Sequence, residues 1–265
     1  MKLSAVLIAR DEAKNLRECF EGLKFCDEIV MVDSGSHDGT ADLALSLGAK
    51  VFLNPFKDFA SQKNFAIGKA RGEWVLLVDA DERVSPELAS EIRRALEAPR
   101  ADGYFLRRRN RIFGRWMCHG DSAGDKQLRL ALRQKAVFAG RVHERIYLDK
   151  TTVLREPLLH YSTPDVKDYM KKLNLYTSLE AQGLAENGAG QVEKMKSRPF
   201  VFFCYVHFVR QGFLDGLEGF LFSVLSAYYE FVRRAKQWEL METCHPRDLQ
   251  SGIKLDSRSK IAGMT

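Results

Sequence analysis

Short apolar runs alternate with helix-like segments through the first hundred residues, and this alternation constrains the fold more than any other feature of the sequence. The runs cover residues 3–9, 28–32, 50–53 and 74–78, and helical spacing of apolar residues follows each of them, at 12–23, 40–47, 59–70 and 85–96. Strands that alternate with helices in this way form a mostly parallel sheet. We therefore predict an α/β domain with helices flanking that sheet.

Carboxylates follow three of these predicted strands. Asp11 and Glu12 come after the first strand, Asp33 ends the second, and Asp79 and Asp81 follow the fourth. Loops after parallel strands meet at one edge of the sheet, where α/β proteins bind ligands. So many acids at one edge would repel one another unless a cation lay among them, and an Asp-x-Asp pair suits one hard divalent cation.

Missing motifs narrow the class of ligand. The chain has neither a G-x-G-x-x-G after the first strand nor a G-x-x-x-x-G-K-[ST], so a dinucleotide site and a P-loop are not supported. The loop at 33–40, Asp-Ser-Gly-Ser-His-Asp-Gly-Thr, allows a tight turn onto a helix but holds no lysine for phosphates. A sugar nucleotide remains possible, because a carboxylate can accept a base N–H and a metal can hold the diphosphate.

The pattern becomes mixed after residue 99. Strands are predicted at 103–109, 127–132, 153–154 and 158–161, and a helix at 165–186. We divide the chain into a catalytic domain at 1–190, an aromatic and basic helical segment at 191–240, and a polar tail at 241–265. Within the catalytic domain, 1–100 forms the nucleotide-binding half and 101–190 the acceptor half.

The net charge of the chain is +6, but the charged residues are distributed unevenly along it. Residues 1–100 carry 14 basic and 17 acidic side chains, which leaves 27 and 18 for the remainder. Strand alternation would place Arg107, Arg109 and Arg111 on one face. Guanidinium groups suit phosphates and carboxylates, so this face is predicted to meet an anionic glycolipid acceptor or a phospholipid surface, a simple solvated face being the alternative. No nucleic-acid motif accompanies the arginines, and the acidic sheet edge would repel nucleic acid.

Aromatic residues gather near the C-terminus, where 12 of the 28 lie within residues 200–238. The apolar runs at 200–209 and 220–232 are shorter than the roughly 20 residues that a spanning helix needs. Their basic flanks favour helices lying in a membrane interface, and packing on the catalytic domain or another subunit is the alternative. The flanking residues are Arg198, Arg210, Arg233, Arg234 and Lys236.

Four segments at the predicted strand ends together resemble glycosyltransferase family 2, which has a Rossmann-like fold of the GT-A type. They are Ala9-Arg10-Asp11-Glu12, residues 33–40, Gln62-Lys63-Asn64-Phe65-Ala66 and Asp79-Ala80-Asp81-Glu82-Arg83. Later segments at 110–116, 127–130, 142–144 and 159–161 resemble the subgroup of lipopolysaccharide core glucosyltransferases. The resemblance covers roughly residues 3–240.

The resemblance implies a UDP-sugar donor, a divalent Mg²⁺ or Mn²⁺ ion, and inversion at the sugar. Asp81 is the expected metal ligand, with Asp79 and His143 beside it, although His143 could equally be a structural histidine that fixes Glu144. The expected nucleotide-sugar contacts are Ala9, Asp11, Glu12, Asp33, Ser34, Lys63, Asn64, Asp79 and Ala80.

An inverting transferase needs a general base on the acceptor side. The resemblance points to Asp125, just before the strand at 127–132, but the stretch 120–126 departs from the subgroup's usual aromatic-rich sequence. Glu144 and Asp121 therefore stay open as alternatives.

The sequence as a whole predicts transfer of a hexose, with glucose from UDP-glucose as first expectation, to a glycolipid such as the lipopolysaccharide inner core. A nucleotidyltransferase and a non-catalytic membrane scaffold are the alternatives. Five cysteines without a C-x-x-C pair fit reduced thiols, and no signal-peptide pattern is found. We expect a peripheral protein on the cytoplasmic face of the bacterial inner membrane, and a homo-oligomer is possible.

Overall fold

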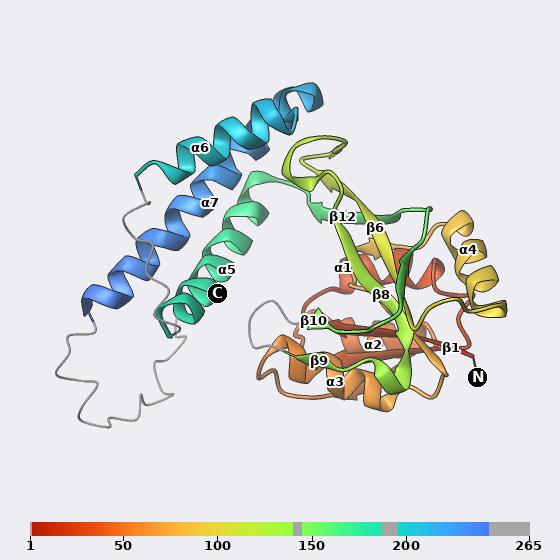
Figure 1. Ribbon diagram of the computed structural model, residues 1–265. Helices are drawn as coiled ribbons and strands as arrows, with labels where there is room; N and C mark the ends of the chain where they lie inside the picture. Colours follow the sequence, from red (N-terminus) through yellow and green to blue (C-terminus); the bar gives the residue numbers. More distant parts are fainter. Residues whose placement is uncertain (1, 140–144, 187–195, 244–265) are drawn as a thin grey trace.

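The computed structural model describes residues 2–139, 145–186 and 196–243. Its first half is a parallel sheet in the order β3-β2-β1-β4, flanked by helices (Figure 1). The strands are β1 (Leu3–Ala9), β2 (Glu28–Asp33), β3 (Lys50–Leu53) and β4 (Trp74–Leu77). The helices are α1 (Ala13–Glu21), α2 (Thr40–Ser46), α3 (Phe59–Lys69) and α4 (Pro86–Glu97). The predicted α/β class and mostly parallel sheet are confirmed.

The central strand β1 is apolar on both faces, which explains its continuous hydrophobic run. Ala5 and Leu7 pack into the larger core with residues of α1, α2 and α4, whereas Val6 packs into a second core with Ala66 and Ile67 of α3. A strand covered on both faces does not alternate between apolar and polar residues. Its ends, not its faces, are therefore the places left for polar chemistry.

The second half extends the sheet from β4. An antiparallel strand, β8 (Lys126–Leu132), lies between β4 and β6 (Gly103–Ile112), and the order continues through β12 (Leu158–Thr163) to β5 (Glu82–Arg83). Shorter strands complete the half. They are β7 (Arg115–Trp116) and β11 (Thr151–Val153), which pair with β6, and the separate pair β9 (Phe138–Ala139) and β10 (Arg145–Ile146).

The two-residue strand β5 positions the candidate site. It follows Asp79-Ala80-Asp81 directly and pairs antiparallel with β12, where Glu82 stands opposite His160. The N–H of Tyr161 also donates to the carbonyl of Asp81 at 2.9 Å. The Asp-x-Asp segment is thereby fixed against a strand from the second half of the chain.

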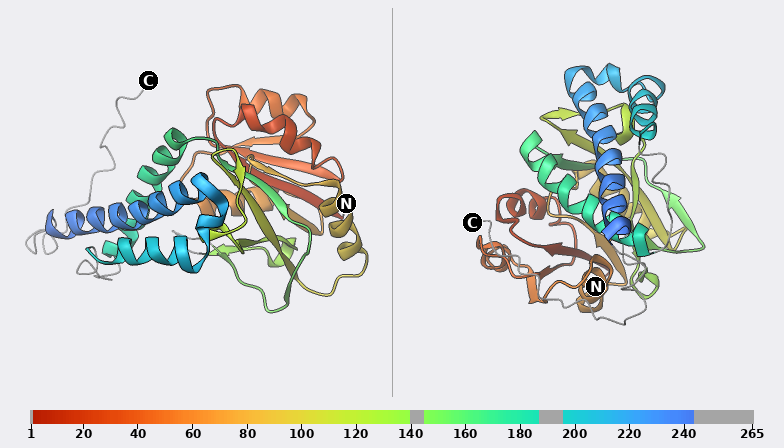
Figure 2. Two further views of the ribbon diagram at one scale, coloured as in Figure 1. Left: turned by 90° about the horizontal axis from the view of Figure 1, so that it is seen from above. Right: turned by 90° about the vertical axis from the view of Figure 1, so that its left-hand side faces the viewer.

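Three helices extend from one side of the sheet (Figures 1 and 2). They are α5 (Val166–Glu186), α6 (Arg198–Cys204) and α7 (Gly216–Thr243), and α7 packs against both others. A π-helical turn (Tyr205–Val209) and a 3-10 turn (Gly212–Asp215) connect α6 to α7. Since α7 packs against both α5 and α6, the described helices of the segment predicted at 191–240 form one helical unit with the end of the predicted acceptor half. None of the helices in the described ranges has the length and apolarity to cross a membrane.

Candidate active site

The loops after β1 and β2 are tied together at the carboxyl edge of the sheet. The N–H of Asp11 donates to Ser36 Oγ at 2.9 Å, and Asp11 Oδ1 accepts from the N–H of His37 at 2.7 Å. The N–H of Glu12 donates to Thr40 Oγ1 at 2.8 Å. Asp11 takes a positive φ of 55°, a strained conformation that concentrates at functional sites. The two loops therefore present Asp11 and Glu12 as one unit.

Asp33 offers a buried and unoccupied acceptor atom at this edge. Its side chain is 1% exposed, and its Oδ1 accepts from the N–H groups of Gly35 and Ser36 at 2.7 and 2.8 Å. Its Oδ2 is buried without a hydrogen-bond partner among the described residues. A buried carboxylate oxygen in this state is costly unless a donor reaches it. The N–H of a nucleotide base would satisfy Oδ2, so the residues present fit a bound nucleotide.

Asp79 is held by an ion-pair cluster with the buried side chains of Arg129 and Glu82. Arg129 Nη2 contacts Asp79 Oδ2 and lies 2.6 Å from Glu82 Oε1, and Glu82 Oε2 accepts the N–H of Asp79 at 2.9 Å. Burial alone would raise the pKa of Asp79, but the charge of Arg129 outweighs it and holds this pKa well below its usual range. For the fully buried Glu82, burial dominates and raises the pKa. Asp79 is thus an oriented, ionised carboxylate.

Replacing Arg129 by methionine should destabilise the fold by about 3–5 kcal/mol, because the buried carboxylate of Glu82 loses its cation at 2.6 Å and keeps only Arg108, whose Nη1 lies 3.5 Å away. The free energy of unfolding, measured by urea denaturation, checks this. Lys126→Met on the exposed part of the same strand serves as control and should cost less than about 0.5 kcal/mol. Adding Glu82→Gln should recover part of the loss. A loss below about 1 kcal/mol in Arg129→Met would show that the cluster does not hold the site.

Asp81 and His160 direct an oxygen and a nitrogen toward the same space. Asp81 Oδ2 lies 3.4 Å from His160 Nε2 and 3.7 Å from Lys172 Nζ. His160 Nδ1 lies 2.7 Å from Asn110 Oδ1, and since a carbonyl oxygen only accepts, Nδ1 carries the proton. In the neutral ring, Nε2 then keeps its lone pair for a cation, the usual arrangement of a metal-binding histidine.

These two side chains fit a divalent ion that a substrate helps to bind. Among the described residues there is no group of three or more His, Cys, Asp or Glu side chains that could hold a metal by itself. Mg²⁺ is commonly held by one or two carboxylates together with substrate phosphates. Asp81 stays the predicted metal ligand, whereas the predicted His143 and Glu144 lie outside the described residues. His160 was not predicted as a ligand, because only the β5–β12 pairing brings it to Asp81.

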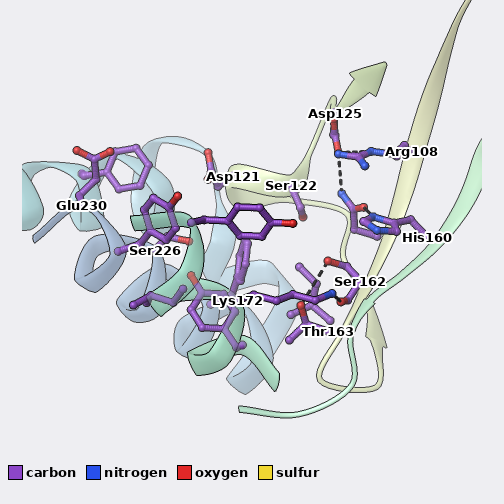
Figure 3. A pocket seen from close by; sticks show the side chains of 18 residues that line it. Arg108, Asp121, Ser122, Asp125, His160, Ser162, Thr163, Lys172, Ser226 and Glu230 are labelled. Atoms are coloured by element: carbon purple, nitrogen blue, oxygen red, sulfur yellow. Dashed lines mark hydrogen bonds and ion pairs between the residues drawn. The ribbon is translucent and has the colours of Figure 1, made fainter. Parts of the chain in front are cut away.

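Asp125 lies in the same polar cluster and is held by Arg108. Arg108 Nε and Nη2 lie 2.7 and 2.6 Å from Asp125 Oδ2, and Asn110 Nδ2 lies 3.3 Å from the same atom. Because Asn110 also accepts from His160, a continuous chain of contacts runs from Asp125 through Asn110 and His160 to Asp81. Figure 3 shows Asp125 and Arg108 close to His160. The structure brings the predicted base and the predicted metal ligand into one site.

A pocket of about 410 Å³ opens beside this chain, between β6, β12 and the C-terminal helices (Figure 3). Its polar end contains Arg108, Asp125, His160 and Lys172. Asp121 also lines it, and burial raises the pKa of that carboxyl. The opposite end is aromatic and is formed by Tyr169, Tyr176, Phe202, Phe222 and Tyr229. The volume lies within the range of small-molecule sites, roughly 300–1,000 Å³.

The arginine that enters the pocket is not one of those predicted to bind the acceptor. Arg107, Arg109 and Arg111 alternate with buried or half-buried residues along β6 and are exposed, as alternation predicted. Arg108 and Asn110, on the other face of the strand, line the pocket instead. Side chains alternate between the two faces of a strand. The same alternation that placed the three exposed arginines on one face also places Arg108 on the opposite face, and it could have identified Arg108 as a residue of the site.

Three of the residues predicted to contact the nucleotide form hydrogen bonds with neighbouring segments around the site. Asn64 Nδ2 donates to the carbonyl of Phe138, and Asn64 Oδ1 accepts from its N–H, at 2.9 and 2.8 Å. The side chain of Asn64 therefore anchors β9, and its contact with a nucleotide stays a prediction. Ser34 Oγ accepts from Gln62 at 2.9 Å, and the carbonyl of the buried Ala80 accepts from Arg83 at 2.7 Å.

Two other predicted contacts border the site. Lys63 contributes a positive charge that helps lower the pKa of Asp79. Ala9 ends β1 opposite Asp33 in the parallel register, and its carbonyl accepts the N–H of Ser34 at 3.0 Å.

Comparison with known proteins shows which family the chain belongs to. Residues 4–152 match the family model described as glycosyl transferase family 2. A protein of Rickettsia bellii named as an uncharacterized glycosyltransferase is 30% identical, over 96% of this chain and 92% of its own. The lipopolysaccharide core biosynthesis glycosyltransferase LpsC of Rhizobium meliloti is 30% identical, over 90% of this chain and 93% of its own. The solved structure of S. aureus TarS 1-349 in complex with UDP-GlcNAc has a TM-score of 0.49 and 13% identity, with 92% of each chain covered.

The family match covers more than half of the chain, and the relatives extend it over nearly the whole length. It includes the loops with Asp11 and Asp33, the Asp79-Ala80-Asp81 segment and Asp125. This agrees with the resemblance seen in the sequence and decides against a nucleotidyltransferase or a non-catalytic scaffold. The protein is a glycosyltransferase and belongs to family 2.

Proposed function

We propose that this glycosyltransferase moves a hexose, with glucose as the first choice, from a UDP-sugar to a hydroxyl group of a glycolipid such as the inner core of lipopolysaccharide. The observation that carries the proposal is the chain of contacts from Asp81 to Asp125, which puts a pocket for an acceptor beside the sheet edge that suits a donor. The name of the relative LpsC supports this class of acceptor.

The donor would lie across the loops after β1, β2 and β4. Asp33 Oδ2 is free to accept the N–H of uracil, and Asp11 and Glu12 lie on the adjoining loop, where a ribose would follow. Burial raises the pKa of Glu12, and the nearby Asp81 adds to this effect. Glu12 therefore lies near the Asp-x-Asp segment, and one nucleotide could contact both Glu12 and that segment.

Catalysis would depend on charge held at fixed positions. Asp81, with His160 beside it, would hold an Mg²⁺ or Mn²⁺ ion, which would supply positive charge against the diphosphate of the donor. Asp79, fixed by Arg129, keeps its carboxylate directed at the donor side. Asp125, held in place by Arg108, would take the proton of the acceptor hydroxyl as that oxygen attacks the sugar opposite the leaving UDP. Such an attack would invert the anomeric centre.

The pocket suits a sugar acceptor. Its aromatic end can pack against the apolar face of a sugar ring, and Arg108, Asp125 and Lys172 at its polar end can contact hydroxyl groups. The helices that line it, α6 and α7, expose apolar side chains on their outer surface. A lipid-linked acceptor fits this combination, so we propose that the enzyme works as a peripheral protein at the cytoplasmic face of the bacterial inner membrane.

A thermal-shift screen of nucleotides with Mn²⁺ tests the donor. UDP at about 100 times its Kd should stabilise the fold by about 2.7 kcal/mol, which raises Tm by roughly 5 °C or more, whereas GDP and dTDP should have smaller effects. Asp33→Asn should remove most of the preference for UDP, because an amide cannot both accept the loop N–H groups and accept from the base. Asp42→Asn, an exposed acid on α2, is the control. A larger shift with GDP, or an unchanged preference in Asp33→Asn, would contradict the assignment.

A further inference from the structure

The connection between α6 and α7 exposes a cluster of large apolar side chains. We call this cluster the hairpin tip. Its members are Phe208, Val209, Phe213, Leu214 and Leu217, which are between 48% and 69% exposed. Contiguous exposed apolar surface is uncommon on soluble proteins and marks a place where another surface binds. The pocket does not explain the hairpin tip, because none of these residues lines it.

The exposed face of β6 carries a second feature that the pocket does not use. We call Arg107, Arg109 and Arg111 the arginine face. Within the described ranges, none of the three forms an ion pair with a carboxylate. Arg109 and Arg111 instead lie over the ring of Trp116, at 5.5 and 5.9 Å from its centroid. Three cations without counter-charges indicate an anionic partner.

The structure brings these two features together. The hairpin formed by β6 and β7 lies next to the α6–α7 connection in all views, and Arg115 Nη1 lies 3.7 Å from Glu218 Oε2 of α7 (Figures 1 and 2). The N–H groups of Cys118 and His119 donate to Asp215 Oδ2 at 3.0 and 2.8 Å, and Asp215 is 3% exposed. The buried Asp215 thus fixes the hairpin tip to the segment that follows β7.

We propose that the hairpin tip and the arginine face together bind an anionic phospholipid bilayer. Apolar side chains enter the interface between head groups and acyl chains, and adjacent arginines pair with the phosphates. A second copy of this chain is a poorer partner, because a two-fold contact through the same surface would bring the uncompensated arginines of both copies together. The inference rests on the proposed function only in that a lipid-linked acceptor would reach the pocket from this bilayer.

Sedimentation of the full chain with vesicles tests the proposal. The protein should bind vesicles that contain phosphatidylglycerol at least about 10-fold more tightly than vesicles of phosphatidylcholine alone. The double variant Arg107→Gln/Arg109→Gln should weaken binding to the anionic vesicles by about 25-fold, at about 5-fold per arginine. Phe208→Ser/Leu217→Ser should weaken binding to both kinds of vesicle by at least about 10-fold.

Matched variants elsewhere on the surface act as controls. Arg94→Gln on α4 and Leu53→Ser at the end of β3 change an exposed arginine and a 73% exposed leucine, and neither should affect binding. Equal binding by all variants, or no binding by the unchanged chain, would overturn the proposal. So would a dimer that Phe208→Ser/Leu217→Ser dissociates in the absence of vesicle binding.

An activity assay with a water-soluble, deacylated acceptor separates this inference from the proposed function. All four variants should keep transfer to that acceptor, because none of the changed residues lies in the pocket. Vesicle binding without any transfer would support the bilayer-binding surface and contradict the proposed acceptor. Transfer to the soluble acceptor without vesicle binding would support the proposed acceptor and contradict the bilayer-binding surface.

Discussion

Replacing Asp81 by asparagine should abolish the effect of Mn²⁺ on UDP binding and lower transfer by about 1,000-fold or more. The neutral amide is a weak ligand, and the charge that the ion supplies to the leaving diphosphate is worth several kcal/mol. His160→Gln should have a smaller effect of the same kind, because it removes the nitrogen at 3.4 Å but keeps the carboxylate. Calorimetric titration of UDP with and without Mn²⁺ measures both.

Asp102→Asn is the control for this prediction. Asp102 lies at the far end of β6, where it pairs with Lys135 at 2.8 Å, so its loss changes one carboxylate without touching the site. The metal dependence of UDP binding should be unchanged in this variant. Undiminished dependence in Asp81→Asn as well would show that the ion is bound elsewhere or is not required.

Replacing Asp125 by asparagine should lower kcat by about 1,000-fold while the affinity for the UDP-sugar stays nearly unchanged. A general base contributes about 100- to 10,000-fold, and Asp125 lies on the acceptor side of the chain of contacts, away from the nucleotide loops. Arg108 holds the carboxylate in place, and an amide would keep the shape but not accept a proton. Initial rates together with a binding titration separate the two effects.

Asp121→Asn provides the comparison, because Asp121 lines the same pocket and burial raises its pKa. If Asp125 is the base, Asp121→Asn should reduce kcat by less than about 10-fold. The reverse order, with Asp121 essential and Asp125 dispensable, would move the proton acceptor to Asp121. Full activity in both variants would return the role to Glu144.

The first half of the fold could be predicted well because its signals are local. Residues 3–9 and 50–53 become β1 and β3 with the predicted bounds, and the helix expected at 85–96 is capped by Ser85, whose Oγ accepts the N–H of Leu88 at 3.2 Å. Apolar runs, an N-cap and proline at the first helical position are read within a few residues. The position of the acidic residues at the strand ends could be predicted from the same local pattern.

The remainder of the site depends on pairings between distant segments. β5 has only two residues and no periodicity of its own, yet its pairing with β12 brings His160 to Asp81. β8 lies antiparallel beside β4, which places Arg129 against Asp79. The role of Asn64 likewise depends on β9. Such contacts between distant parts of the chain follow from sheet order, which strand patterns alone do not specify.

The anomeric configuration of the product tests the central claim most directly. UDP-glucose carries its sugar in the α configuration, and attack from the pocket by a hydroxyl that Asp125 deprotonates requires inversion. NMR of the product made from ¹³C-labelled UDP-glucose, Mn²⁺ and a lipopolysaccharide core acceptor should show a new β-linked glucose. An α-linked product, or glucose released only to water, would contradict an acceptor bound in this pocket opposite the leaving UDP.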